Sequence, residues 1–375
     1  MRTILVFALT LASQVAPHIY AQSTDVRAGS HAVFVMTNSV RRNEVIAYSR
    51  TKDGLLVERD HYATGGRGSG GTTDPLGSQG SLTLSQDHSL LFAVNAGSGE
   101  ICVFRVSGAK LDLTQVVSSG GSAPVAVAQH DNLVYVVNFA GNSNVVGFHL
   151  DEAGNLIKIH HSIRYLSSAN SGPSSIAFSP DGRFLLVTEK LTNNIDTFSV
   201  LNDGSISPPK ITQNPLPGLF DVVFSPDGAA LVVQTGPAGS SNASSISSYL
   251  VEEGGTLSPI TASVPTLGSA ACWVALTPNG EFAFTANSAS STVSAFAIGS
   301  SGNITAVAGT VVATLPAGTT DIDTAVSQDA KYLYTLNSGT GTVGIFAVQQ
   351  DGTLKLTGLA SGLEAQHGFN GIAAF

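Results

Sequence analysis

One pattern of short strands and turns recurs seven times along this chain. Its clearest copy is PSSIAFSPDGRFLLVTEKLTNNIDTFSV, residues 173–200, where alternating apolar residues predict strands at 175–179, 184–188 and 194–200, with an SPDG turn after the first. Copies of the second strand lie at 33–37, 91–94, 134–137, 185–188, 231–234, 283–286 and 333–336. Units of about 40 to 55 residues, each with four strands, predict an array of small sheets rather than one large sheet.

The two ends of the chain predict that this array closes into a ring. Six units have a first strand of their own, at 81–85, 125–129, 175–179, 221–225, 273–277 and 322–327. The first unit lacks one, and the last five residues, 371–375, supply it. We therefore predict an all-β, seven-bladed β-propeller closed by a C-terminal strand that completes the N-terminal blade, because radial closure leaves no long free sheet edge. A linear solenoid or tandem sandwiches would need no such shared strand.

The composition argues against nucleic acid as a partner and against a metal site. The formal charge is −9, which argues against nucleic acid, since binding a polyanion needs clustered Lys and Arg. The 40 glycines and only 11% charged residues are typical of many strands joined by tight turns. Cys102 and Cys272 are interpreted as small buried hydrophobic residues. No HExxH or similar ligand spacing occurs, so neither a metal nor another cofactor is predicted.

The first 21 residues have the pattern of a secretory signal. One basic residue is followed by an apolar run at 4–12 and a small residue at Ala21. The run is too short for a membrane anchor, and no second such run predicts a membrane span. We therefore expect a signal peptide at 1–21 and one propeller domain at 22–375, exported to a periplasm or secreted.

Three segments carry a resemblance to a known family: LFAVNAGSGEICVFRV, SPDGRFLLVTEKLTNNIDTFSV and LYTLNSGTGTVGIFAVQQDGTL. They resemble the YVTN-type repeats of the lactonase-like seven-bladed propellers, the group of cycloisomerase-type 6-phosphogluconolactonase and 3-carboxymuconate lactonizing enzyme. The resemblance covers residues 32–375 and implies a hydrolase or cycloisomerase of small anionic lactones.

The resemblance also implies roles for particular residues. Catalytic lactonizing members carry a Glu in an N-E-L-type motif, matched here by the run TEKL, which implies that Glu189 acts as a general base. The alternative is that Glu189 caps this loop or pairs with Lys190. Those members carry an Arg-His pair where this chain has Ser174 and Ser175. The positive charge for a lactone oxyanion would then come from neighbouring loops, with Arg41, Arg42 or Lys190 as candidates.

The loops that lead into the first strand and out of the second strand of each blade share one end of a propeller channel, where function is expected. From this rim we predict as catalytic residues Glu189 and His367, and as substrate-binding residues Arg41, Arg42, Gln79, Asn138, Lys190, Asp221, Trp273 and Asp323. The aspartates, with Asp321, either cap turns, which we prefer, or form a Ca²⁺ site with Glu189. Trp273 either stacks on a ligand or packs between blades, and His367 either titrates or bonds a backbone carbonyl.

Three functions stay open from the sequence. The first is an exported lactonase-like enzyme acting on small anionic or sugar-derived lactones. The second is a non-catalytic exported module that binds a small ligand, and the third is a scaffold that binds another protein across one face. The Gly-rich connection at 63–80 lacks the GxxxxGK[ST] pattern of a phosphate loop. It is either a mobile flap over the rim with Arg67 at its tip or a plain surface loop, which we prefer.

Overall fold

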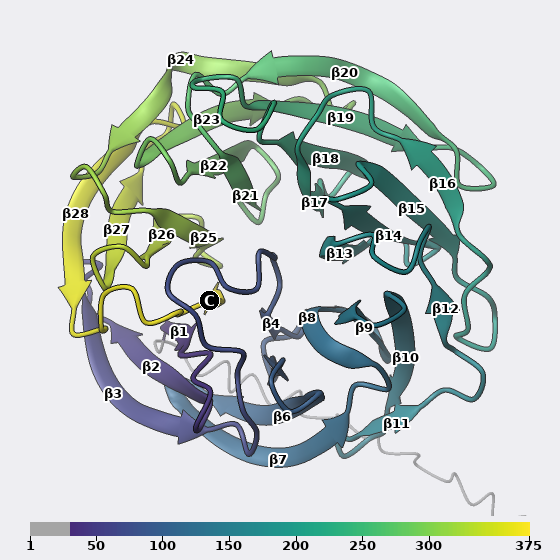
Figure 1. The fold of residues 1–375 in the computed structure, drawn as a ribbon. Coiled ribbons are helices and arrows are strands. Elements are labelled where there is room, and N and C mark those ends of the chain that lie inside the picture. Colours follow the sequence, from purple (N-terminus) through teal and green to yellow (C-terminus); the bar gives the residue numbers. More distant parts are fainter. Residues whose placement is uncertain (1–30) are drawn as a thin grey trace, which may run out of the picture. The chain divides into compact units, whose positions relative to one another are not determined.

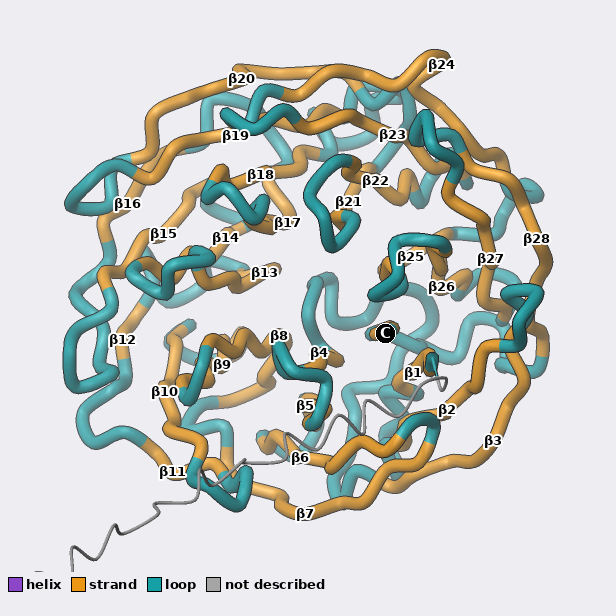
Figure 2. The backbone as a smooth tube through the Cα atoms, turned by 180° about the vertical axis from the view of Figure 1, so that it is seen from behind, coloured by secondary structure: helices purple, strands orange, loops and turns teal. Residues whose placement is uncertain are grey.

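The computed structural model describes residues 31–375, and in this range the chain forms seven antiparallel sheets and no helix. Figure 1 shows the seven sheets arranged around a common centre, and Figure 2 shows the same ring from behind. This confirms the predicted all-β, seven-bladed propeller. The predicted signal peptide at 1–21 lies outside the described residues. In the described range no helix is long and apolar enough to cross a membrane.

Each blade is given from its innermost to its outermost strand. Blade 1 contains β29 (Ile372–Ala374), β1 (Ala32–Met36), β2 (Glu44–Arg50) and β3 (Leu56–Ala63). Blade 2 contains β4 (Leu82–Leu84), β5 (Leu90–Asn95), β6 (Glu100–Ser107) and β7 (Lys110–Ser118). Blade 3 contains β8 (Ser122–His130), β9 (Leu133–Ala140), β10 (Asn144–Leu150) and the short outer strands β11 (Leu156–Lys158) and β12 (Arg164–Tyr165).

Blade 4 contains β13 (Pro173–Phe178), β14 (Phe184–Glu189), β15 (Asn194–Ser199) and β16 (Lys210–Gln213). Blade 5 contains β17 (Leu219–Phe224), β18 (Ala229–Gln234), β19 (Ser245–Val251) and β20 (Leu257–Pro265). Blade 6 contains β21 (Ala271–Leu276), β22 (Phe282–Asn287), β23 (Thr292–Ile298) and β24 (Ile304–Thr314). Blade 7 contains β25 (Asp321–Val326), β26 (Tyr332–Asn337), β27 (Thr342–Val348) and β28 (Leu354–Ser361).

The ring closes as predicted, by pairing the two ends of the described chain. β29 runs antiparallel to β1, with Val35 opposite Ile372 and Val33 opposite Ala374. The backbone bond from Met36 N to the Gly371 oxygen, 3.0 Å long, extends this ladder. The apolar core lies between neighbouring blades: every residue of β14 is buried, whereas the outer strand β16 is almost entirely exposed. Closure therefore gives blade 1 the inner strand that its own segment lacks.

Five of the seven inner strands begin earlier than the predicted ranges, and each of these five contains a β-bulge near its first residues. In β17 the register shifts between Leu219 and Asp221, and in β21 it shifts between Ala271 and Trp273. The same irregularity occurs in β8, β13 and β25. A bulge inserts one residue and breaks the period-two alternation on which the sequence prediction depends.

Polar side chains in or directly after the bulges link neighbouring inner strands. The Asp221 carboxylate accepts the N–H of Val274 in β21 at 2.9 Å, and the Asp323 carboxylate accepts the N–H of Ile372 in β29 at 2.9 Å. The hydroxyl of Ser175 makes the equivalent, longer contact to Val222 in β17. Asp221 and Asp323 therefore join blades, and the second of these bonds holds the closing strand.

Because the carboxyl group of Asp321, the first residue of β25, is buried, we expect the stability of the protein to depend on pH. Both of its carboxylate oxygens are buried without a hydrogen-bond partner among the described residues. Burial raises the pKa of Asp321 from 3.8 to about 8, that of Asp323 to about 8 and that of Asp221 to about 7. Between the unfolded and folded pKa values the native state binds more protons than the unfolded state, so stability falls as pH rises through that range.

We expect a higher melting temperature at pH 5 than at pH 8 for the wild-type protein, measured by thermal unfolding. Asp321→Asn removes the buried charge while keeping the shape, so it should raise the melting temperature at pH 8 by a few degrees and change it little at pH 4. If Asp321→Asn changes the melting temperature by the same amount at pH 8 and at pH 4, Asp321 does not cause the pH dependence of stability.

Candidate functional site

The connection between β3 and β4 covers the centre of the ring. In Figure 1 it is the dark blue loop that passes over the middle of the propeller. Leu76, Gly77 and Ser78 in this connection are buried. We call residues 64–80 the plug loop. The preferred interpretation from sequence, a plain surface loop, is wrong, because the middle of the segment is buried; the alternative of a mobile flap over the rim stays a prediction.

Three blades hold the plug loop through its last residues. The Ser78 hydroxyl donates to the Val125 oxygen of β8 at 2.8 Å, and the indole N–H of Trp273 in β21 donates to the Ser78 oxygen at 3.0 Å. The N–H of Gln79 donates to the Ser174 oxygen of β13 at 2.8 Å. Trp273 also packs edge-to-face on Phe220, with ring centroids 5.2 Å apart. Gln79 and Trp273 therefore hold the loop in place.

A pocket of about 300 Å³ lies beside the plug loop, and we call it the plug pocket. Its walls come from the plug loop and from loops or strand ends of blades 2 to 5. The lining residues are Ser69, Asp74, Pro75, Leu76, Gly77, Ala96, Ala123, Val125, Phe139, Lys190 and Phe220. Most of this lining is apolar, so Asp74 and Lys190 are the charged groups that a small molecule in the pocket would meet.

Lys190 follows β14 directly and points its ammonium group at the plug loop. Nζ donates to the Gly77 oxygen at 2.5 Å and lies 5.6 and 5.5 Å from the ring centroids of Phe139 and Phe220. Burial lowers the pKa of Lys190, and the neighbouring Asp74 charge opposes that effect. The ring faces and the carbonyl stabilise a positive charge that has lost part of its water.

Asp74 is the carboxylate of the plug pocket. Its Oδ1 accepts the Gly77 N–H at 2.8 Å and the Asn370 side-chain amide at 3.1 Å, whereas Oδ2 makes no hydrogen bond to a described residue. Burial raises the pKa of Asp74 to about 6, although the Lys190 charge acts in the opposite direction. A carboxylate with a pKa near 6 and one oxygen free is suited to accept a proton from water at neutral pH.

Glu189, the predicted general base, lies away from the plug pocket. It is fully buried, where its Oε1 accepts the Ser167 N–H at 2.9 Å and its Oε2 accepts the hydroxyls of Ser167 and Thr192. Asp196 accepts the same Ser167 N–H at 3.1 Å, and burial together with the Glu189 charge raises the pKa of Asp196 to about 8. These contacts support a structural role that fixes the loop between blades 3 and 4. The catalytic role of Glu189 stays a prediction.

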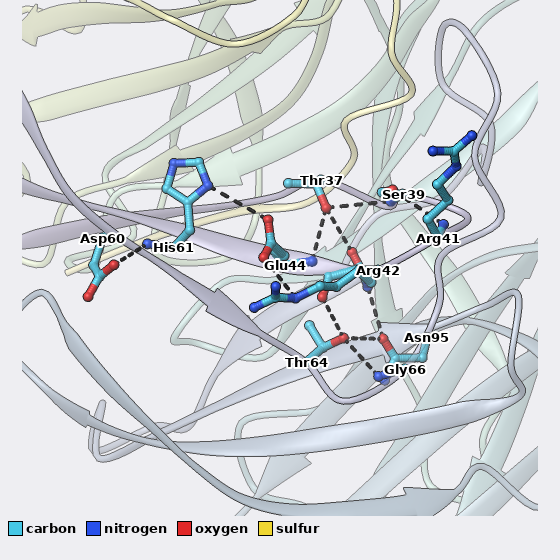
Figure 3. Close-up of polar contacts among 11 residues, drawn as sticks. Thr37, Ser39, Arg41, Arg42, Glu44, Asp60, His61, Thr64, Gly66 and Asn95 are labelled. Carbon is cyan, nitrogen blue, oxygen red and sulfur yellow. Dashed lines mark hydrogen bonds and ion pairs between the residues drawn. The ribbon is translucent and has the colours of Figure 1, made fainter.

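His367 and Arg42, although far apart in sequence, line a second concavity of about 560 Å³ over blade 1, which we call the blade 1 groove. Figure 3 shows Glu44 between Arg42 and His61, and Arg41 pointing away from them. The Arg42 Nε lies 3.1 Å from a Glu44 oxygen, and the His367 Nδ1 lies 2.6 Å from a Glu364 oxygen. Carboxylates thus already pair with both predicted site residues.

Asn138 is also a predicted binding residue, but it is buried and donates to the Asn144 side chain at 3.1 Å. Within residues 31–375 no group of three or more His, Cys, Asp or Glu side chains is arranged to hold a metal ion. The structure therefore divides the predicted rim into the plug pocket, the blade 1 groove and inter-blade contacts. Sequence reasoning did not find Asp74, because its only signal was an Asp-Pro turn inside a Gly-rich loop.

Comparison with known proteins decides the family. The family described as lactonase, 7-bladed beta-propeller, matches residues 18–236 and 222–365. This chain belongs to the seven-bladed β-propeller lactonase family. The resemblance seen in the repeats is thereby confirmed. The search of curated protein sequences found no match to this chain.

Solved structures with the fold of this lactonase-family propeller come from several bacteria. A putative 6-phosphogluconolactonase from Bacteroides uniformis has a TM-score of 0.70 at 17% identity, covering 92% of this chain and 99% of its own. The periplasmic gluconolactonase PpgL from Pseudomonas aeruginosa has a TM-score of 0.68 at 17% identity, covering 91% and 99%. Virginiamycin B lyase from Staphylococcus aureus has a TM-score of 0.53 at 15% identity, covering 76% and 86%. Since one fold carries different activities, the chemistry must be argued from the site.

Proposed function

We propose that this protein is a lactonase-like hydrolase that opens small lactones in the plug pocket. One observation carries the proposal: Asp74, with a pKa raised to about 6 and a free Oδ2, and the Lys190 ammonium line the same largely apolar pocket. Membership of the lactonase family supports hydrolysis as the chemistry.

In the proposed reaction the Asp74 carboxylate takes a proton from a water molecule as the water oxygen attacks the lactone carbonyl carbon. The carbonyl oxygen becomes negatively charged, and the Lys190 ammonium stabilises it. The bond between the carbonyl carbon and the ring oxygen then breaks, and the departing oxygen receives the proton held by Asp74. The product is an open hydroxy acid.

The lining of the pocket bears on the substrate. Lys190 is its one cation among the described residues, and Phe139 and Phe220 offer apolar surface. Arg42 lines the blade 1 groove instead, Arg41 lines neither pocket, and both side chains are exposed. We therefore propose small lactones with at most one negative charge as substrates. Glucono-lactone should be hydrolysed with a higher kcat/KM than its phosphorylated form, because a dianionic phosphate would need further cations.

Lys190→Met tests the assigned cation. It should lower kcat for glucono-lactone hydrolysis about tenfold to a hundredfold with a smaller change in KM, since the charge acts mainly on the developing oxyanion. Lys190→Arg, which keeps the charge, should restore part of the rate. If Lys190→Met hydrolyses the lactone as fast as the wild type, the proposed role of Lys190 is wrong.

A binding protein without turnover is the second candidate, and one contact favours it. The Nζ of Lys190 already donates one of its three N–H groups to the Gly77 oxygen, so fewer donors are left to stabilise a developing oxyanion. A lactone that raises the melting temperature without being hydrolysed would support this candidate over the hydrolase.

We also propose that the protein is exported. The support is the signal-like pattern of residues 1–21, together with the periplasmic gluconolactonase among the structures that share the fold. Mass spectrometry of the protein expressed with its full N-terminus, recovered outside the cytoplasm, should show cleavage after Ala21.

A further inference from the structure

The outer edge of blade 3 differs from that of the other six blades. Their outer strands are single segments, whereas here β11 and β12 are separated by residues 159–163. Figure 1 shows the two short strands at the outer rim, away from the plug loop. β11 pairs with the end of β10 around Phe148, and β12 pairs with its start at Val145. The chain thus leaves the sheet in the middle of the edge and returns to it.

The excursion is held by specific bonds. The Ser162 hydroxyl contacts both the N–H and the oxygen of Gly147 in β10, at 3.1 and 3.2 Å, and so replaces the missing strand partner. His161 adopts a positive φ of 58°, and its oxygen accepts a 2.8 Å bond from Arg164 Nη1. Ser162 and Ile159 are buried, whereas His160 and His161 are exposed. The turn therefore presents two imidazole rings to solvent from a defined backbone.

A concavity of about 600 Å³ lies at this turn, and we call it the blade 3 pocket. Its lining residues are Lys158, Ile159, His160, His161, Ile163 and Arg164. Four of these six carry a basic side chain and none is acidic, in a chain whose formal charge is −9. Such a local excess of positive charge attracts anions against the field of the whole protein.

The donors in the pocket are available to a ligand. Arg164 uses Nη1 for the oxygens of His161 and Ile163, and no other nitrogen of its guanidinium bonds to a described residue. The His160 and His161 rings pack edge-to-face, with their centroids 4.7 Å apart, and neither ring forms an ion pair with a described residue. Bonds from Ser205 lower the pKa of Asp203, and the Arg164 charge adds to this, but Asp203 does not line the pocket.

We propose that the blade 3 pocket is a binding site for a phosphate- or sulfate-type oxyanion carried on a small molecule. Lys158 and Arg164 supply charge and N–H donors, and the imidazole N–H groups of His160 and His161 add further donors. Ile163, at the edge of the pocket, offers apolar surface to the carbon part of the ligand. This site is separate from the plug pocket and does not depend on the hydrolase proposal.

The test uses the full chain with inorganic phosphate, inorganic sulfate and vesicles that contain phosphatidylglycerol, at constant ionic strength. Phosphate or sulfate should shift the NMR signals of His160 and His161, assigned by histidine-selective labelling. Calorimetric titration should show that Lys158→Ala weakens binding about three- to tenfold. Lys110→Ala, which removes an exposed lysine from the outer strand of blade 2, is the matched control and should leave the affinity unchanged.

Three outcomes would overturn the proposal: no shift at His160 and His161, equal weakening by Lys158→Ala and Lys110→Ala, or binding to vesicles without binding to either free anion. The last outcome would indicate a membrane contact instead. Lactone hydrolysis should be unaffected by Lys158→Ala, which keeps this test independent of the plug pocket.

Discussion

Replacing Asp74 by asparagine is expected to lower kcat for lactone hydrolysis about a hundredfold to ten-thousandfold, the usual contribution of a positioned general base. The asparagine keeps the bonds that Oδ1 accepts from Gly77 and Asn370, so the plug loop should stay in place. Initial rates on glucono-lactone, together with the melting temperatures of both proteins, measure the effect.

The pH profile gives this prediction a signature that a structural defect would not produce. Because the pKa of Asp74 is raised to about 6, the wild-type kcat/KM should rise with pH and reach half its plateau near pH 6. In Asp74→Asn that rise should disappear from whatever activity remains. A wild-type rate that stays constant from pH 5 to pH 8 would contradict the assignment.

The variant Glu189→Gln tests which carboxylate is the general base: Asp74, which lines the plug pocket, or Glu189, to which the family resemblance assigns this role. Glu189 is enclosed by Ser167 and Thr192, and the plug pocket does not include it. If Asp74 is the base, Glu189→Gln changes stability and leaves most of the hydrolysis rate. If Glu189 is the base, Glu189→Gln abolishes hydrolysis and Asp74→Asn does not.

Deleting residues 371–375 is expected to abolish cooperative folding of the propeller. The deletion removes β29, exposes the edge of β1 and leaves the Asp323 carboxylate without the Ile372 N–H. The loss of the buried strand, together with the loss of the bond that the buried Asp323 side chain accepts, should exceed about 5 kcal/mol, a large part of the stability of a typical domain. Urea unfolding followed by circular dichroism should show no native baseline.

Adding the missing strand back controls for nonspecific damage. A synthetic peptide with the sequence of residues 368–375, GFNGIAAF, should restore a cooperative transition by pairing with β1, because an extended peptide can complete an open sheet edge. A truncated protein that unfolds with the wild-type midpoint and needs no peptide would show that closure contributes little.

The ring could be predicted from sequence because its signals are local and repeated. Alternating apolar residues and SPDG-type turns recur in the blades, and residues 371–375 match the one strand that blade 1 lacked. The starts of the inner strands were harder to predict. The bulges at Asp221 and Trp273 interrupt the alternation at those points, so the sequence pattern became clear only after them.

The site was less predictable, because it depends on a loop without periodicity. Lys190 was predicted from its place after a repeated strand, and it does line a pocket. Asp74 was missed because the position of the plug loop is fixed by distant partners such as Ser174, Val125 and Trp273. Contacts between residues so far apart in the chain cannot be predicted from turn-forming residues or from composition.

A crystal structure with gluconate, the hydroxy acid formed from glucono-lactone, would test the central claim most directly. We predict that the carboxylate of gluconate lies in the plug pocket, within hydrogen-bond distance of Lys190 Nζ and beside Asp74. Gluconate bound in the blade 1 groove or against Glu189, with the plug pocket empty, would contradict it.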